Sequence, residues 1–142
     1  MPLHCISRDD DRGGNERTIL FPDQAKPTNL HAVWDFNLVR AVIEKQDVLK
    51  CADALEAGIT PAQAQAWSGG APVDWAMESH VVAIQSAYAG VPPVGGPPFA
   101  LDAAYVRANT RIVHLRLQQA GVRLALILNR ALGNEPPLGP LP

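Results

Sequence analysis

The chain has 142 residues, 47% of them hydrophobic, and its 12 basic and 14 acidic side chains give a net charge of -2. A chain of this size and composition can bury the core of one domain without disulfides or metals as structural supports. The near-balanced charge excludes a strongly basic protein that binds duplex DNA or an anionic membrane over its whole surface. Any nucleic-acid contact must therefore be local.

The N-terminal arm that precedes the first helix is rich in turn-forming and charged residues. Only residues 17–21 in it suggest a strand, which allows for one short hairpin. Residues 1–11 lack the basic-then-apolar order of a secretion signal, and no apolar run in the chain approaches the roughly 20 residues of a membrane-spanning helix. We therefore expect an irregular arm, no export signal in this chain and no membrane contact.

Apolar residues spaced by three and four positions predict helices in the rest of the chain. Asn29 and Thr60 are of the residue types that cap helix N-termini, and Gly58 is of the type that ends them. The segment GVPPVGGPP at 90–98 and the tail at 133–142 are too rich in Pro and Gly to continue a helix. The fold class is thus all-α, a helical bundle, with helices predicted over 30–45, 47–57, 61–67, 74–89 and 101–132.

Three side chains are of the types that bind zinc: His4 in the arm, and His31 and Asp35 on the first helix. A spacing of four residues places His31 and Asp35 on one helix face. Two imidazoles and one carboxylate leave a fourth tetrahedral position open for water or a substrate oxygen. The spacing alone does not decide the matter, because His and Asp four residues apart also occur on solvated helix faces.

The order of several short segments resembles the S1/P1 nuclease family, the zinc-dependent single-strand nucleases that also act as 3′-nucleotidases. The segments are PLH at 2–4, DRGGN at 11–15 and NLHAVWD at 29–35, followed by WAMES at 75–79 and AGVRLA at 120–125. The first three carry the resemblance by their order and spacing. The last two are helical packing segments that would mean little alone.

The resemblance implies a mostly helical fold of the phospholipase C/P1 nuclease type that holds three zinc ions. It implies that His4, His31 and Asp35 bind one of them, and that activated water hydrolyses single-stranded DNA or RNA and 3′-nucleotides. In the family the Gly-Gly-Asn turn lines the nucleotide pocket, so Gly13 and Gly14 would let backbone approach a base and Asn15 would bind its edge. No residue is assigned as a general acid or base.

The family has further zinc ligands before its Pro-Leu-His segment, and these have no counterpart here. We therefore expect residues 1–132 to be a C-terminal portion of a zinc nuclease domain, followed by a tail at 133–142. Such a chain would be weak or inactive alone, and helices without their packing partner would expose an apolar face and favour self-association. Relatives are typically exported, which implies a secreted or periplasmic parent. The alternatives are a non-catalytic fragment that binds zinc or a nucleotide, and a zinc phospholipase C.

The arm also carries Arg8, Arg12 and Arg17, which could bind phosphate through forked hydrogen bonds. Aspartates alternate with these arginines, so we favour a solvated loop whose charges compensate one another. Cys5 and Cys51 permit one disulfide at most and are expected to be free thiols.

The remaining polar and aromatic candidates have simpler structural explanations. His80 and His114 lack a partner at ligand spacing, so neither is expected to bind metal. Trp34 and Trp75 fall in the apolar rows of their helices and are expected in the core before any role in base stacking. Glu78 could be a general base, but it more simply complements the positive N-terminal end of a helix.

Overall fold

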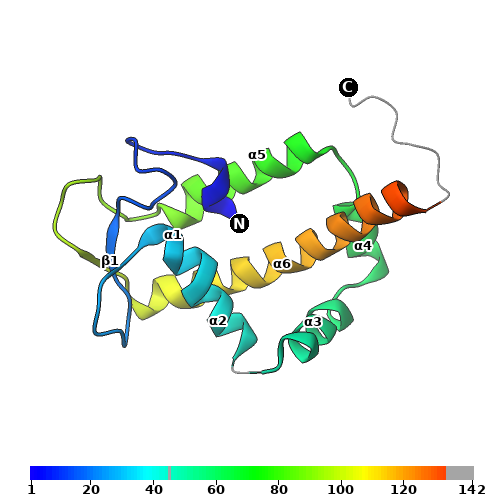
Figure 1. Ribbon diagram of the computed structural model, residues 1–142, viewed down its shortest axis with the longest axis horizontal. Helices are drawn as coiled ribbons and strands as arrows, with labels where there is room; N and C mark the ends of the chain where they lie inside the picture. Colours follow the sequence, from blue (N-terminus) through cyan, green and yellow to red (C-terminus); the bar gives the residue numbers. More distant parts are fainter. Residues whose placement is uncertain (45, 134–142) are drawn as a thin grey trace.

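The computed structural model describes residues 1–44 and 46–133, and it is mostly helical (Figure 1). The predicted tail therefore lies, apart from Gly133, outside the described residues. The helices are η1 (Pro2–Cys5), α1 (Leu30–Ala32), η2 (Val33–Asn37), α2 (Leu38–Ile43), α3 (Val48–Ala57), α4 (Pro61–Trp67), α5 (Pro72–Val82), η3 (Ala83–Ala87) and α6 (Ala103–Leu132). The strands are β1 (Thr18–Leu20), β2 (Thr28–Asn29) and β3 (Phe99–Ala100). The mostly helical fold class is confirmed.

Side-chain caps fix where the helices begin. Asn29 Oδ1 accepts a 2.7 Å hydrogen bond from the Ala32 amide, as its N-cap position predicts. Thr60 and Gln63 form a reciprocal capping box at the start of α4. Asp102 caps α6 by accepting from the Tyr105 amide at 2.7 Å, so this helix begins two residues later than the predicted start at 101.

The first predicted helix is a composite of three segments. A π-helical stretch, η2, separates α1 from α2 and carries Asp35. The helix ends at Ile43 because Glu44 adopts a left-handed conformation with φ of 49°. A second π-helical stretch, η3, extends α5 as far as Ala87. Such stretches often occur at functional sites, and η2 is the one that carries a candidate ligand.

A three-stranded sheet in the order β2-β1-β3 closes one end of the molecule. β1 pairs antiparallel with β2, the short hairpin that the arm sequence allowed. β1 also pairs in parallel with β3, with Ile19 opposite Phe99. This pairing ties the arm to the Pro- and Gly-rich loop that precedes β3, at the left of Figure 1.

The core lies where the arm, the composite helix, α5 with η3, and the first half of α6 meet. Trp34 is completely buried in it, as its helical position predicts. The core residues are Leu3, Ile19, Leu30, Val33, Trp34, Leu38, Ala83, Ala87, Tyr88, Val91, Leu101 and Val113. Packing around this cluster holds η1 against α5 and therefore sets the position of His4.

Beyond this core, large apolar side chains are exposed on both long helices. Met77 is 56% exposed on α5, and Leu124 is 57% exposed on α6. Met77 borders an open groove between α5 and α6, and a second open groove lies between α6 and the α3–α4 pair. Within the described residues, no helix is both long and apolar enough to cross a membrane.

Candidate metal centre

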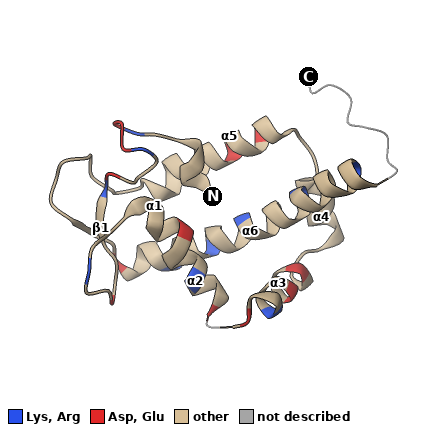
Figure 2. Cartoon of the chain, in the orientation of Figure 1, with Lys and Arg blue, Asp and Glu red and all other residues tan. Residues whose placement is uncertain are grey.

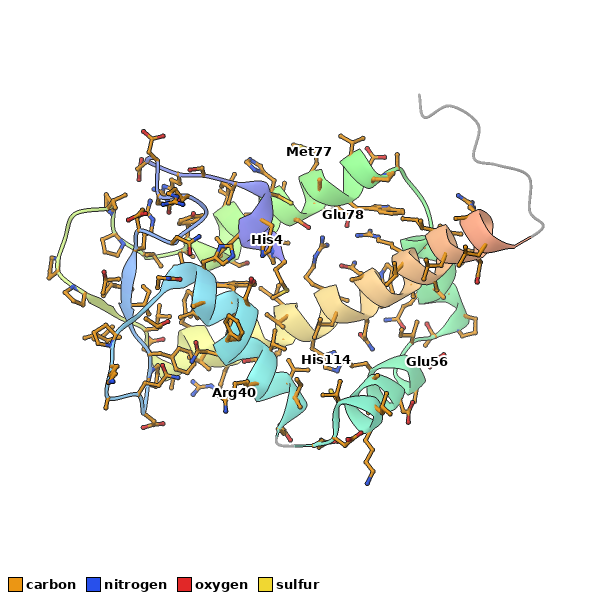
Figure 3. All side chains as sticks on the ribbon, in the orientation of Figure 1. His4, Arg40, Glu56, Met77, Glu78 and His114 are labelled. Carbon is orange, nitrogen blue, oxygen red and sulfur yellow. The ribbon has the colours of Figure 1, made fainter. Side chains whose placement is uncertain are left out.

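The three predicted ligands converge although they come from three different elements. His4 lies on η1, His31 on α1 and Asp35 on η2, and one possible ligand atom from each lies within 4.8 Å of the others. Asp35 Oδ2 is 2.9 Å from His4 Nε2 and 3.2 Å from His31 Nε2. Figure 3 shows His4 beside the ribbon of α1. The structure thus brings together the whole predicted set.

The local sequence accounts for this convergence. Pro2 and Leu3 are buried, which anchors η1 and leaves the His4 side chain 54% exposed beside the composite helix. The four-residue spacing stacks His31 and Asp35 on the adjacent helix face. One ligand is therefore accessible to solvent, while the other two are half-buried on a hydrogen-bonded element.

A backbone carbonyl fixes which nitrogen of His31 is available. His31 Nδ1 lies 2.9 Å from the Gly13 carbonyl oxygen, which can only accept, so Nδ1 carries the proton. In the neutral ring, Nε2 then presents a lone pair toward the Asp35 carboxylate. These two electron-rich atoms repel each other, and a cation bound between them would offset that repulsion.

The Asp35 carboxylate supplies a second indication of a cation. Its Oδ1 atom is buried and has no hydrogen-bond partner among the described residues. A buried carboxylate oxygen without a donor costs free energy unless a positive charge compensates it. Two imidazole nitrogens and a carboxylate are a donor set that zinc accepts, so these residues fit a zinc ion.

The Gly-Gly-Asn turn packs directly against this site. Gly13 and Gly14 are buried and have φ values of 68° and 86°, a region that favours glycine. A Cβ on Gly13 would lie 2.6 Å from the Leu3 carbonyl oxygen, and one on Gly14 would lie 3.2 Å from the His31 amide. Asn15 is exposed, and its side-chain amide donates a 2.8 Å bond to the Arg12 carbonyl.

The interpretation of the arm as a solvated loop is wrong for two of its charges. Arg8, Arg12 and Asp9 are exposed, and Figure 2 shows acidic and basic residues alternating along this segment. Arg17 and Asp11, however, have side chains that are 2% and 0% exposed and form a buried ion pair. Burial alone would raise the pKa of Asp11, but hydrogen bonds from Arg17, the Arg8 amide and Tyr88 hold it below its ordinary value.

The interpretation of Glu78 as a helix-dipole partner is also wrong. Glu78 is the seventh residue of α5 and not part of its first turn. Its carboxylate accepts from Arg123 at 2.7 and 2.9 Å and from Arg116 at 3.1 Å, on the side of α5 that faces α6 (Figure 3). Burial alone would raise the pKa of Glu78, but the hydrogen bonds and positive charges of Arg123 and Arg116 hold the pKa below its ordinary value. Glu78 therefore joins α5 to α6.

The other histidines, Trp75 and the cysteines also have defined environments. His80 Nδ1 lies 2.9 Å from the Cys5 carbonyl oxygen, and His114 is exposed on α6. Trp75 is only half-buried, and the Arg123 guanidinium lies 5.0 Å from its ring centre. Cys5 and Cys51 are free, as expected.

Comparison with known proteins identifies the family. A family model described as S1/P1 nuclease matches residues 1–133. The chain belongs to the S1/P1 nuclease family. It is 34% identical to endonuclease 2 of Arabidopsis thaliana over 94% of its length, and 30% identical to endonuclease 4 of the same plant over 96%. It spans 47% of each of these two endonucleases, about half of their length.

Sequence reasoning missed the groups that support the three candidate ligands. The Gly13 carbonyl is a backbone atom, and no side-chain pattern identifies it as the acceptor for His31. Tyr88 lies 77 residues from Asp11, to which its hydroxyl donates. The available signal was the apolar spacing of the α5 segment, which places Tyr88 on its buried face but does not name its partner.

Proposed function

We propose that this chain is part of a zinc-dependent nuclease that hydrolyses single-stranded DNA or RNA to 5′-phosphorylated products. The same centre would hydrolyse 3′-nucleotides to nucleosides and inorganic phosphate. The observation that supports the proposal is the convergence of His4, His31 and Asp35 beside the glycine turn, within 4.8 Å of one another. The endonuclease relatives and the S1/P1 family support a nucleic-acid substrate.

Each residue of the centre has a distinct part in this proposal. Zinc, when bound, lowers the pKa of a coordinated water and offsets negative charge on phosphate oxygens. His31 and Asp35 hold the ion against the helix, and the exposed His4 borders the side from which a substrate arrives. Because the Gly13 carbonyl holds the Nδ1 proton of His31, Nε2 is oriented as a ligand before any ion binds.

The Gly-Gly-Asn turn supplies the proposed nucleotide contact. Gly13 and Gly14 pack too closely on Leu3 and Leu30 to tolerate side chains, so their backbone forms the floor of the turn. Asn15 is exposed and uses one amide hydrogen internally. Its carbonyl oxygen and second amide hydrogen can therefore meet the acceptor and donor edge of an unpaired base.

These three residues could hold one zinc ion, whereas the family resemblance implies three. Within residues 1–44 and 46–133, His4, His31 and Asp35 form the one group of three His, Cys, Asp or Glu side chains at ligand distance. We therefore expect about one zinc equivalent and weak hydrolysis from this chain. The same observation favours a second candidate function, a non-catalytic fragment that binds zinc or a nucleotide.

The experiment compares wild type with Asp35→Ala, both purified in parallel. Wild type should contain about one zinc equivalent by elemental analysis, and Asp35→Ala should lose about tenfold or more of its zinc affinity, because the centre loses its only carboxylate. Hydrolysis of single-stranded DNA and 3′-AMP by wild type should be slow, dependent on zinc and stopped by a chelator.

The matched control is Asp10→Ala, since Asp10 is an exposed carboxylate of the same arm. Equal zinc content in wild type and Asp35→Ala would reject the metal centre. Equal DNA hydrolysis by the two would indicate a contaminating nuclease. Hydrolysis of phosphatidylcholine vesicles without hydrolysis of DNA would favour the phospholipase C alternative. Zinc binding without any hydrolysis would favour the non-catalytic fragment.

The exposed apolar side chains on α5 and α6 lead to a separate expectation. Met77 and Leu124 are each more than half exposed, and exposed apolar side chains that form one large patch mark an interaction surface. We expect dimers or larger species in size-exclusion chromatography with light scattering, in proportions that rise with concentration. Leu124→Gln should shift the distribution toward monomer, and Val48→Gln on α3 is the control. A monodisperse wild-type monomer at high concentration would contradict self-association.

A further inference from the structure

Asp11, Arg17 and Tyr88 form a buried polar cluster in which none of the three is a metal ligand. Asp11 Oδ1 accepts from the Tyr88 hydroxyl at 3.0 Å and from the Arg8 amide at 3.0 Å. Asp11 Oδ2 accepts from Arg17 Nε. A buried ion pair persists only when further hydrogen bonds compensate for the water that both charges lose, and this cluster supplies them.

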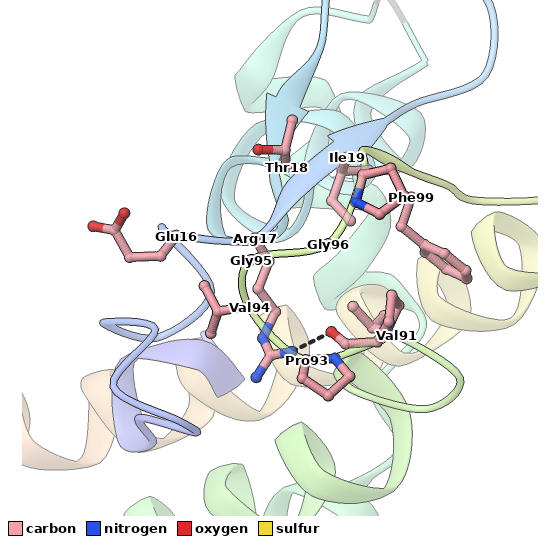
Figure 4. A pocket seen from close by; sticks show the side chains of 12 residues that line it. Glu16, Arg17, Thr18, Ile19, Val91, Pro93, Val94, Gly95, Gly96 and Phe99 are labelled. Carbon is pink, nitrogen blue, oxygen red and sulfur yellow. Dashed lines mark hydrogen bonds between the residues drawn. The ribbon is translucent and has the colours of Figure 1, made fainter.

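The cluster ties the arm to two distant segments. The Arg17 guanidinium donates to the Pro92 carbonyl, the bond drawn as a dashed line in Figure 4, and to the Arg8 carbonyl at 3.2 Å. It also lies 5.0 Å from the centre of the Tyr88 ring, which follows η3. The loop after η3 borders a cavity of about 270 Å³ with residues 16–19 of the arm. Arg17 thus joins the arm to the chain on both sides of Gly90.

Asp11 and Arg17 are also the two ends of the glycine turn. The Glu16 amide donates to the Asp11 carbonyl at 3.1 Å, and the Arg17 amide donates to the Gly14 carbonyl at 3.3 Å. The Asp11–Arg17 ion pair therefore joins the two ends of the turn, and the two backbone hydrogen bonds close the turn between them. The Gly13 carbonyl, at the middle of the turn, accepts from His31 Nδ1.

We propose that Tyr88 and Arg17, acting through Asp11, are positioning residues for His31. They fix the Gly13 carbonyl where it keeps the imidazole proton on Nδ1 and leaves Nε2 free to bind a divalent cation. The cation-binding part rests on the proposed function, whereas the control of the His31 tautomer does not. A neutral imidazole that loses this acceptor can carry its proton on Nε2, and a protonated Nε2 cannot ligate a metal.

The test compares Tyr88→Phe with Tyr105→Phe. Both substitutions remove one hydroxyl from the interior, since the Tyr105 hydroxyl donates to the Ala87 carbonyl and accepts from Trp34 Nε1. Of these two hydroxyls, only that of Tyr88 donates to Asp11. One readout is the His31 tautomer in the metal-free full chain, from ¹⁵N-imidazole NMR at about pH 8, where an ordinary histidine is neutral. The other is the affinity for Co²⁺, followed by its visible absorption.

Tyr88→Phe is expected to increase the fraction of His31 protonated on Nε2 and to weaken Co²⁺ binding about tenfold, whereas Tyr105→Phe should change neither. Loss of thermal stability in Tyr88→Phe with an unchanged tautomer and affinity would overturn the proposal. If wild type bound no Co²⁺ but the tautomer still shifted, the metal centre would fail and the positioning of His31 would stand. If Tyr88→Phe did not fold, Arg17→Lys would be judged by the same two readouts.

Discussion

Arg17→Met is expected to lower the free energy of unfolding by about 3 to 5 kcal/mol, because it leaves the fully buried Asp11 carboxylate without its charged partner. Methionine keeps much of the apolar stem, so the loss of packing is small. The Tyr88 hydroxyl and the Arg8 amide would still donate to Asp11, but neither carries a formal charge. Urea denaturation followed by circular dichroism measures the change.

Arg12→Met is the matched control for this experiment. Arg12 lies in the same arm, but its side chain is 79% exposed and forms only a 3.4 Å ion pair with Glu16. Exposed pairs of this kind contribute about 0 to 1 kcal/mol. If Arg12→Met and Arg17→Met had the same urea midpoint, the buried ion pair would contribute no more to the stability of the fold than the exposed pair does.

The same ion pair predicts how wild-type stability depends on pH. The pKa of Asp11 is lower in the folded chain than its ordinary value of 3.8. The folded state therefore favours the ionised carboxylate, and its contribution is fully present above the unfolded pKa. That contribution is lost as pH falls through the lower folded pKa. Below pH 4, wild type should lose stability more steeply than Arg17→Met.

Gly13→Ala is expected to have the second large effect, on both stability and the metal centre. An L-residue at φ of 68° costs about 1 to 2 kcal/mol. The new Cβ would also lie 2.6 Å from the Leu3 carbonyl oxygen, and such overpacking costs about 1 to 3 kcal/mol more. That carbonyl belongs to the peptide bond with His4, so relief of the clash should displace this candidate ligand and weaken zinc binding.

Gly90→Ala separates the two contributions. Gly90 has a similar φ of 72°, but nothing lies within 4 Å of its ideal Cβ. It should therefore show the conformational cost alone and keep the zinc affinity of wild type. Thermal unfolding of the metal-free proteins and zinc titration of each variant give the two quantities. Equal losses in the two variants would mean that the contact with Leu3 has no influence on the centre.

The helices and the pairing of His31 with Asp35 were predictable because both depend on residues that are close in sequence. Apolar spacing and the capping residues Asn29 and Thr60 locate helices through contacts within a few positions. His31 and Asp35 belong together for the same reason. His4 was grouped with them by its residue type, and only the resemblance to the S1/P1 family supported that grouping, because nothing local relates His4 to a residue 31 positions away.

The supporting groups could not be predicted because their partners meet only in the folded chain. The alternation of charges in the arm sequence is the same whether Arg17 faces solvent or pairs with Asp11. Burial of this ion pair becomes favourable only through its hydrogen bonds with Tyr88 and the Pro92 carbonyl, which come from a distant segment. The parallel pairing of β1 with β3 joins Ile19 to Phe99, and no short-range pattern specifies it. Glu78 likewise pairs with arginines that lie on another helix, α6.

The sequence by itself determined the helical class, the helix caps Asn29 and Thr60, and the three candidate ligands, because these follow from periodicity, capping chemistry and family motifs. Only the tertiary structure decided which nitrogen of His31 is free, which arginine of the arm is buried and what holds the glycine turn. The physical reason is that burial and hydrogen-bond partnership depend on the segments that pack together. Such segments can be far apart in sequence, as Asp11 and Tyr88 are at a separation of 77 residues.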